Sequence, residues 1–200
     1  MRTRILAGAS LVVLFLLSFR IVAADSTGAI TGSVNAGAAK RFPTVVYVDG
    51  VPGQKLTAPA KVSMDQKRKI FSPHVLTVQV GTTVDFLNDD PFEHNVFSPD
   101  GEKYDLGKWY RGDKRSYTFT RSGIYTQLCK LHPEMIAYVV VLKNPFFAAV
   151  DDLGKFRIPN VPVGTWVLKI WNERFRPNQL EKSFNVTVGA GQEAKVDITF

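Results

Sequence analysis

The sequence predicts an all-β protein that contains one larger β-sandwich and a second, smaller one. Three observations support this fold class. From Asp25 onward, Gly, Pro or Asn interrupts the chain roughly every 8 to 15 residues, which is the spacing of short strands joined by turns. The segments between these breaks are rich in Val, Ile, Thr, Phe and Tyr, which favour strands. No long stretch carries the 3.6-residue period of an amphipathic helix.

Residues 1–24 are predicted to be a secretory signal peptide. Arg2 and Arg4 precede an apolar run over residues 5–17, and small residues end the segment at Ala23 and Ala24. A membrane anchor is the competing interpretation. The apolar run is shorter than the ~20 residues that a membrane span needs, and Arg20 interrupts its far end. We therefore expect a periplasmic or secreted protein without stable membrane insertion.

The first block of strands precedes residue 143. Apolar and polar residues alternate over 83–86 and again over 116–119, which is typical of antiparallel strands with one buried face. The clearest predicted strands of this block are 75–80, 83–87, 115–119, 123–129 and 137–142.

A second block begins near Asn144 and contains no cluster of metal-binding residue types. Its sequence predicts a turn at 151–154 and a connecting loop at 159–164, where Gly, Pro and Asn are concentrated. The predicted strands of this block are 156–158, 165–171, 183–188 and 195–200.

The charge pattern argues against nucleic acid as a partner. Removing the three arginines of the predicted signal peptide lowers the formal net charge from +7 to +4. Nucleic-acid-binding domains usually carry a basic stripe with interleaved aromatic residues. The one dense basic cluster in this chain is Lys67-Arg68-Lys69, which we expect to be a solvated turn.

The single cysteine, Cys129, is the most informative feature of the composition. Exported proteins normally pair their cysteines, and one cysteine cannot form a disulfide within its own chain. An unpaired thiol in an oxidising compartment is open to oxidation unless something occupies it. A soft metal ion would do so.

Candidate ligands for such an ion are His94, Cys129, His132 and Met135. Two imidazoles, a thiolate and a weak axial thioether form the ligand set of blue-copper electron-transfer sites. A cysteine at a strand end, followed by a loop that returns within six residues to the next strand, brings Cys129, His132 and Met135 around one point. His94 follows the predicted strand 83–87 after a short turn, so the four donors are expected at one end of a sandwich.

The motifs around these residues resemble the plastocyanin-like cupredoxins, and the short ligand loop is most similar to that of amicyanin. The resemblance covers about residues 60–142. It is carried by Phe71-Ser72-Pro73, the segment 80–88, His94-Asn95, Gly123-Ile124-Tyr125 and Cys129-x-x-His132-x-x-Met135. It implies a Greek-key cupredoxin β-sandwich that binds one type 1 copper ion per chain.

The resemblance also implies a role for each residue. Cys129 would give the dominant copper–sulfur bond, His94 and His132 would complete the trigonal plane, and Met135 would be the weak axial ligand. The backbone N–H of Asn95 would restrain the cysteine sulfur. Redox partner proteins would dock near the exposed edge of His132. One departure is Gln127, because cupredoxins often have an aromatic residue two positions before the copper cysteine.

A second resemblance is to the carboxypeptidase-regulatory (transthyretin-like) β-sandwich. Its motifs are Ile30-Thr31-Gly32-Ser33-Val34, the segment 152–166 and the final strands 186–200. The implied organisation is a signal peptide (1–24), an N-terminal β segment (25–59), a cupredoxin domain (60–142) and a second sandwich (143–200). The N-terminal segment could supply the first strands of the second sandwich, with the cupredoxin inserted between them, or it could belong to the cupredoxin.

The predicted function is one-electron transfer through the copper site, without catalysis. Multicopper oxidases and copper nitrite reductases need further histidine-rich sites, whereas this chain has three histidines in total. We expect the third, His74, to have a structural role. The main alternative function is a periplasmic copper carrier or sensor. A third interpretation, a pure adhesion or scaffold module, requires the four ligands to be coincidental.

Overall fold

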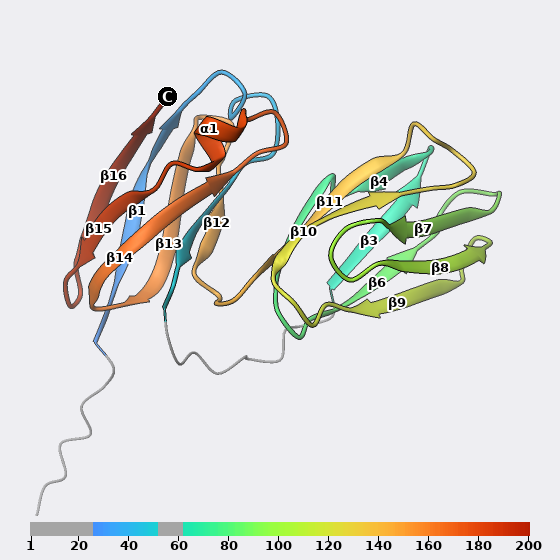
Figure 1. The fold of residues 1–200 in the computed structure, drawn as a ribbon, viewed down its shortest axis with the longest axis horizontal. Helices are drawn as coiled ribbons and strands as arrows, with labels where there is room; N and C mark the ends of the chain where they lie inside the picture. Colours follow the sequence, from blue (N-terminus) through green and yellow to red (C-terminus); the bar gives the residue numbers. More distant parts are fainter. Residues whose placement is uncertain (1–25, 52–61) are drawn as a thin grey trace, which may run out of the picture.

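The computed structural model describes residues 26–51 and 62–200, which form two β-sandwich lobes (Figure 1). The predicted signal peptide at 1–24 lies outside the described residues. Within the described ranges, no helix is long and apolar enough to cross a membrane. The one short helix in those ranges is α1 (Pro177–Leu180), so the all-β prediction is confirmed.

The first sandwich contains strands β3 to β11 in two sheets. One sheet has the strand order β4-β3-β6-β9, with β3 (Val62–Lys67), β4 (Ile70–Ser72), β6 (Thr83–Leu87) and β9 (Lys114–Thr118). The other has the order β5-β11-β10-β7-β8, with β5 (Val75–Gln79), β7 (His94–Ser98), β8 (Tyr104–Trp109), β10 (Gly123–Leu128) and β11 (Ile136–Leu142). Apolar side chains from both sheets, including Phe86, Trp109 and Val139, form one buried core between them.

The second sandwich combines strands from both ends of the chain. One sheet has the order β13-β1-β16, with β1 (Thr27–Asn35), β13 (Lys155–Pro162) and β16 (Glu193–Thr199). The other has the order β12-β2-β14-β15, with β2 (Val45–Asp49), β12 (Phe147–Ala149), β14 (Gly164–Trp171) and β15 (Phe184–Val188). Its core includes Ile30, Val46, Ile158, Leu168 and Ile198.

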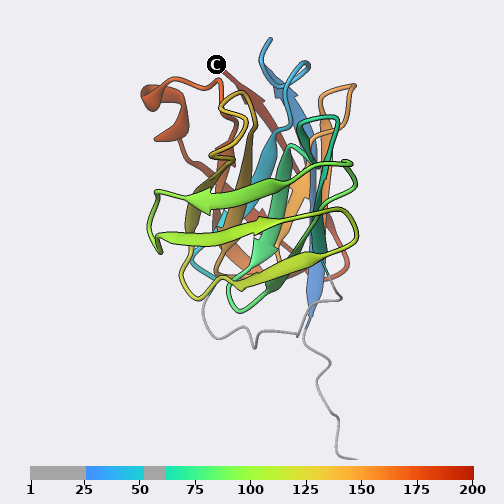
Figure 2. The same cartoon turned by 90° about the vertical axis from the view of Figure 1, so that its right-hand side faces the viewer.

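Strand pairing shows how the two sandwiches follow one another in the chain. β1 pairs in parallel with β16 and antiparallel with β13, and β2 pairs with β12 and β14. The chain therefore leaves the second sandwich after β2, builds the first sandwich from β3 to β11, and returns at β12. The blue strand β1 lies beside the dark red strand β16 in Figure 1, and Figure 2 views the molecule from the side of the first sandwich.

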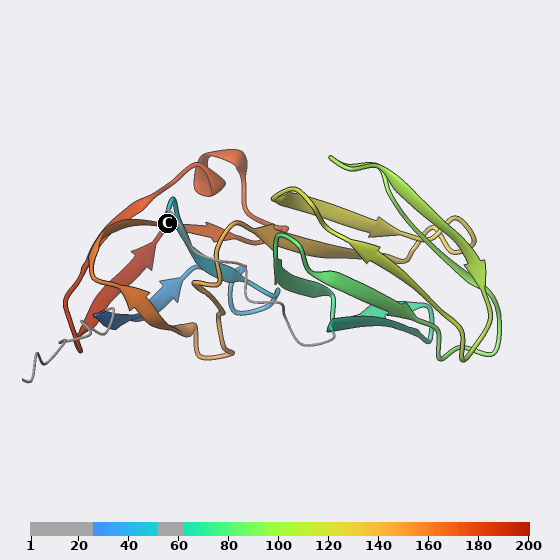
Figure 3. The same cartoon turned by 90° about the horizontal axis from the view of Figure 1, so that it is seen from below.

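The two sandwiches contact each other through a small apolar cluster. Val140 and Leu142 of β11 are buried together with Trp171 of β14, and the rings of Tyr138 and Trp171 meet edge to face at 5.1 Å. His74 adds a polar contact, because its Nε2 lies 2.7 Å from Glu173 Oε1. The view from below shows β10 and β11 reaching the second sandwich at this junction (Figure 3).

The predicted loop at 159–164 is wrong, because β13 continues to Pro162. Val161 is fully buried, and β13 pairs with β1 along this stretch. β13 is an edge strand, so Pro159 and Pro162 can lack a backbone N–H without breaking a ladder on the open side. Asn160 takes a left-handed conformation with φ 56°, near the register shift that separates Gly28 from Ile30.

Candidate metal centre

Four loops of the first sandwich meet at one end: the β3–β4, β6–β7, β8–β9 and β10–β11 connections. Backbone hydrogen bonds tie them together, since Asp89 N–H donates to Gln66 O at 2.9 Å and Gly112 N–H donates to Asn88 O at 3.2 Å. The loop between β10 and β11 lies at the end of this sandwich that points away from the second lobe (Figure 1). Each predicted ligand lies in one of these loops or at a strand end beside it.

Cys129 directly follows β10, and its side chain is buried. The backbone N–H of Asn95 points at its sulfur, with a separation of 3.4 Å. This is the contact that the resemblance to cupredoxins implied for Asn95. A hydrogen bond of this kind stabilises a thiolate and fixes the position of the sulfur.

Both candidate histidines direct Nδ1 at the cysteine. The Nδ1 atom of His94 lies 3.9 Å from Cys129 Sγ, and that of His132 lies 3.8 Å from it. All three ligand atoms are within 4.8 Å of one another. The two imidazole rings are tilted by 59° with centroids 4.8 Å apart.

The ring of His94 is held from behind by Asp90. His94 is completely buried, and its Nε2 lies 2.8 Å from Asp90 Oδ2. Because the ionised carboxylate can only accept a hydrogen bond, Nε2 carries the hydrogen and Nδ1 is left free to act as a ligand. Burial raises the pKa of Asp90, but hydrogen bonds from Lys69 N–H, His94 and Arg68 N–H outweigh it, so the pKa is lower than usual.

His132 lies closer to the surface and contacts Phe92. The two rings are 5.5 Å apart and tilted by 51°. Burial, His94 and Lys69 each lower the pKa of His132, in that order of size, which favours the neutral imidazole that a metal requires. Phe92 also meets His94 edge to face at 5.2 Å, so one aromatic side chain packs against both histidines.

Met135 completes the predicted set and is buried in the same apolar cluster as Cys129. Its backbone N–H donates to His132 O at 3.0 Å, which closes the tight turn between the last two predicted ligands. β11 begins at the next residue, Ile136.

The side chain of Asn95 locks two strands and the ligand loop together. Its Nδ2 donates to Asp105 Oδ1 at 2.7 Å and to Gly107 O at 2.8 Å, and its Oδ1 accepts from Lys130 N–H at 3.2 Å. The hydrogen bond from Lys130, together with Gly107 N–H and Asn95, lowers the pKa of Asp105 to about 2. The loop residue that follows Cys129 is therefore attached to β7 and β8.

Gln127, the departure from the cupredoxin pattern, is fully buried but has its hydrogen bonds satisfied. Its Oε1 accepts the hydroxyl of Tyr104, and its Nε2 donates to Tyr125 O at 2.9 Å. Tyr104 in turn stacks on Tyr117, with ring centroids 3.9 Å apart. An aromatic side chain thus packs beside this position from β8 instead of from β10.

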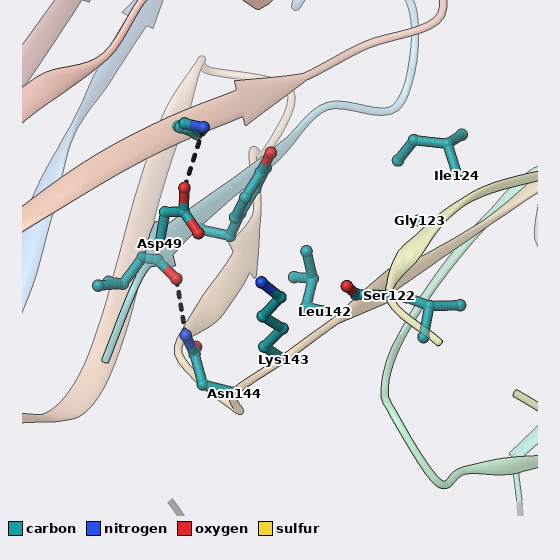
Figure 4. A pocket seen from close by; sticks show the side chains of 11 residues that line it. Asp49, Ser122, Gly123, Ile124, Leu142, Lys143 and Asn144 are labelled. Atoms are coloured by element: carbon teal, nitrogen blue, oxygen red, sulfur yellow. Dashed lines mark hydrogen bonds and ion pairs between the residues drawn. The ribbon is translucent and has the colours of Figure 1, made fainter. Parts of the chain in front are cut away.

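Two other features do not belong to this centre. His74 is bound to Glu173 where the two sandwiches meet. A cavity of about 280 Å³ lies between the sandwiches and contains the ion pair of Lys169 with Asp49 at 2.9 Å (Figure 4). Among the described residues, the group of His94, Cys129 and His132 is the one cluster of at least three such side chains that could hold a metal ion.

The donor set fits copper. Thiolate and imidazole donors suit copper ions, and a long axial thioether is the usual complement in blue-copper sites. Metal–nitrogen and metal–sulfur bonds of about 2.0 and 2.3 Å allow one ion to reach both atoms of a pair that is 3.8–3.9 Å apart. His94, Cys129 and Met135 are buried and His132 is half-buried, so most of the donor atoms are shielded from bulk solvent.

Sequence reasoning missed Asp90 and Phe92. Asp90 lies four residues before His94 in a Pro-containing turn, and a carboxylate so close to a candidate histidine ligand is a signal that could have been used. Phe92 had no distinguishing pattern, because its contacts with the two histidines depend on how the β6–β7 and β10–β11 loops pack.

Comparison with known proteins identifies the segment that carries this centre. Residues 58–142 match the model of the copper binding proteins of the plastocyanin/azurin family. Similar solved structures include a purple cupredoxin from Nitrosopumilus maritimus, with 26% identity over 40% of this chain and 99% of that chain and a TM-score of 0.38. A reduced amicyanin variant has 27% identity over 48% of this chain and 98% of its own, with a TM-score of 0.39.

A copper-containing nitrite reductase from Thermus scotoductus SA-01 is 26% identical over 56% of this chain but 28% of its own length, with a TM-score of 0.41. The plastocyanin/azurin family consists mainly of electron carriers. The match ends at residue 142 and leaves the second sandwich without an assignment.

Proposed function

Since residues 58–142 are a plastocyanin-like copper-binding domain, we propose that this chain is an exported type 1 copper protein that transfers single electrons between redox partners. The proposed ligands are His94, Cys129, His132 and Met135. The observation that carries the proposal is the convergence of one cysteine sulfur and two histidine Nδ1 atoms within 4.8 Å at a buried site. Copper, when bound, would supply the Cu(I)/Cu(II) couple that takes up and releases one electron.

The surrounding residues would keep the donor atoms in place in both oxidation states. Asp90 fixes the ring of His94, Asn95 N–H fixes the sulfur of Cys129, and the Asn95 side chain holds the loop that carries His132. A site that barely moves on reduction needs little reorganisation, and this favours rapid electron transfer. The same rigidity argues against the alternative of a copper carrier, which must release its ion readily.

Electrons would enter and leave beside His132. Apolar side chains at this end of the sandwich are partly exposed: Phe92 by 37%, Leu131 by 38% and Ile136 by 40%. An apolar surface around a ligand lets a partner approach closely and exclude water, which shortens the transfer distance. We therefore place the docking surface at the loop of His132, far from the second sandwich.

Export follows from the predicted signal peptide at 1–24, which would deliver the chain to the periplasm or the medium. In such a compartment an unpaired thiol needs protection, which burial and a bound metal ion would both give Cys129. The second sandwich would act as a spacer or attachment module, because its described residues contain no cluster of candidate metal ligands.

The test is to add Cu(II) to the mature chain and measure the visible absorption, the copper hyperfine splitting and the voltammogram. An electron carrier should give an intense visible band, a narrow splitting and a reversible one-electron wave. A copper carrier should bind Cu(I) without forming a stable cupric thiolate centre. A colourless protein would rule out the proposal.

A further inference from the structure

The β3–β4 hairpin ends at the copper-site end of the first sandwich in an unusual turn. Its two tip residues, Arg68 and Lys69, both have left-handed backbones, with φ 55° and 57°. Two such residues in succession form the type I′ turn of tight hairpins, which normally uses Asn, Asp or Gly. Two long basic side chains therefore occupy positions where the backbone disfavours them.

Asp90 holds this turn in place. Its Oδ1 accepts Arg68 N–H at 2.7 Å, and its Oδ2 accepts Lys69 N–H at 2.9 Å. The same carboxylate binds Nε2 of His94. One buried group thus fixes the basic tip at a constant position relative to a proposed copper ligand.

The tip borders the apolar surface at His132. Lys69 Nζ lies 5.8 Å from the centre of the Phe92 ring, and Phe92 packs against His132. Ile70, directly after the turn, is 60% exposed. A partner that covers His132 would therefore meet the Arg68 and Lys69 side chains.

The side chains of Arg68 and Lys69 form no ion pair with another described residue. Lys67 forms an exposed ion pair with Asp89 at 3.2 Å. Within the described part of the chain, neither Arg68 nor Lys69 has a carboxylate oxygen within 4.0 Å of its side-chain nitrogens. The Asp90 carboxylate under the turn and Glu134 near His132 give this surface mixed charge, but the side chains that project from the hairpin tip are both basic.

We infer that the Arg68-Lys69 tip is a docking element for a redox partner that presents an acidic patch beside an apolar centre. The inference rests on the proposed electron-transfer function and names the partner chemistry for that site. Complementary charge would steer the encounter and fix the orientation, while the apolar surface would bring the redox centres together. Its test therefore measures binding as well as electron transfer.

The probes are cytochrome c, which is basic, and the same cytochrome c after succinylation of its lysines, which is acidic. Binding to the copper-loaded full chain is measured by calorimetry, and the electron-transfer rate constant by stopped-flow mixing, each at low and high ionic strength. We expect the acidic probe to bind more tightly and react faster, by roughly 10-fold or more at low salt, with the difference shrinking as salt screens the charges.

The variant Lys69→Glu, alone and with Arg68→Glu, should remove this preference. Lys103→Glu is the matched control, because Lys103 is exposed in the loop at the opposite end of the same sandwich and the substitution changes the net charge equally. The neutral variant Lys69→Gln should lose part of the preference for the acidic probe, between the parent and Lys69→Glu. All variants should keep the visible band of the parent, because no substituted side chain is a proposed ligand. The midpoint potential of each variant is measured as well, because Lys69 acts electrostatically on His132.

The inference would be overturned if the parent bound the two probes with equal affinity, or if Lys69→Glu and Lys103→Glu weakened binding of the acidic probe equally. Either result would leave the copper function intact. A chain that forms no blue centre, or exchanges no electron with either probe, would overturn the proposed function as well. Binding of the tip to anionic lipid vesicles without a preference for the acidic probe would also contradict the inference, because it would identify a membrane surface as the target.

Discussion

Asp90 is expected to be the most sensitive residue that is not itself a proposed ligand. The substitution Asp90→Ala removes the acceptor for three donors: Arg68 N–H, Lys69 N–H and His94 Nε2. The two backbone groups lie in an exposed turn, where water can replace the carboxylate. His94 is completely buried, so its Nε2–H would lose its only acceptor among the described residues.

The magnitude follows from these contacts. A buried donor left without a partner costs about 1–3 kcal/mol, and each left-handed residue that loses its support adds strain of about 1 kcal/mol. We expect Asp90→Ala to lower the free energy of unfolding of the copper-free protein by about 3–5 kcal/mol. Asp90→Asn keeps one acceptor oxygen and should lose less. The assay is urea unfolding followed by fluorescence.

Asp89→Ala is the matched control. Asp89 is the neighbouring residue, is 53% exposed and forms a surface ion pair with Lys67, which is worth about 0–1 kcal/mol. If Asp89→Ala and Asp90→Ala destabilised the protein equally, the argument that the buried carboxylate supports His94 and the hairpin would be refuted.

Three further substitutions test other parts of the account. Because its pKa is lowered to about 2, well below the ~3.9 of an unfolded aspartate, Asp105 should stabilise the fold at neutral pH and lose this contribution as the pH falls from about 4 towards 2. Unfolding of Asp105→Asn in urea between pH 2 and 6 should therefore show a smaller loss of stability with acid than the parent. Tyr104→Phe removes the hydroxyl that donates to buried Gln127 and should lower the unfolding free energy by about 1–3 kcal/mol. Trp171→Ala empties the apolar junction between the sandwiches, so we expect a loss of about 3–5 kcal/mol and faster proteolysis near residues 143–146.

Each of these has a clear opposite result. If Asp105→Asn lost as much stability as the parent between pH 6 and 2, carboxylates other than Asp105 would account for the acid sensitivity of the fold. A Tyr104→Phe protein of unchanged stability would mean that water replaces the hydroxyl. If Trp171→Ala left both stability and cleavage unchanged, the junction would not contribute to holding the sandwiches together.

Local sequence patterns predicted the fold class and most of the strands of both blocks. Alternation over Thr83–Leu87 and the spacing of Cys129, His132 and Met135 are local features, so the sequence reveals them directly. The segment at 159–164 was misjudged because Pro and Gly favour loops, whereas pairing with β1 at an edge position overrides that preference.

Non-local contacts explain what the sequence could not show. The parallel pairing of β1 with β16 joins residues about 160 positions apart, and no periodicity records it. Asp90 binds the hairpin tip across 21 and 22 residues, so the basic cluster Lys67-Arg68-Lys69 looked like an ordinary solvated turn. Its relation to the metal centre becomes visible only when the β3–β4 and β6–β7 loops are placed side by side.

The most direct test of the central claim is spectroscopy of the mature chain with Cu(II), alongside Cys129→Ser and His74→Ala. The account predicts an intense visible band and narrow copper hyperfine splitting in the parent and in His74→Ala, and loss of both in Cys129→Ser. A colourless parent, or a Cys129→Ser variant that keeps the band, would contradict the assignment of His94, Cys129, His132 and Met135 as the ligands of a type 1 copper site.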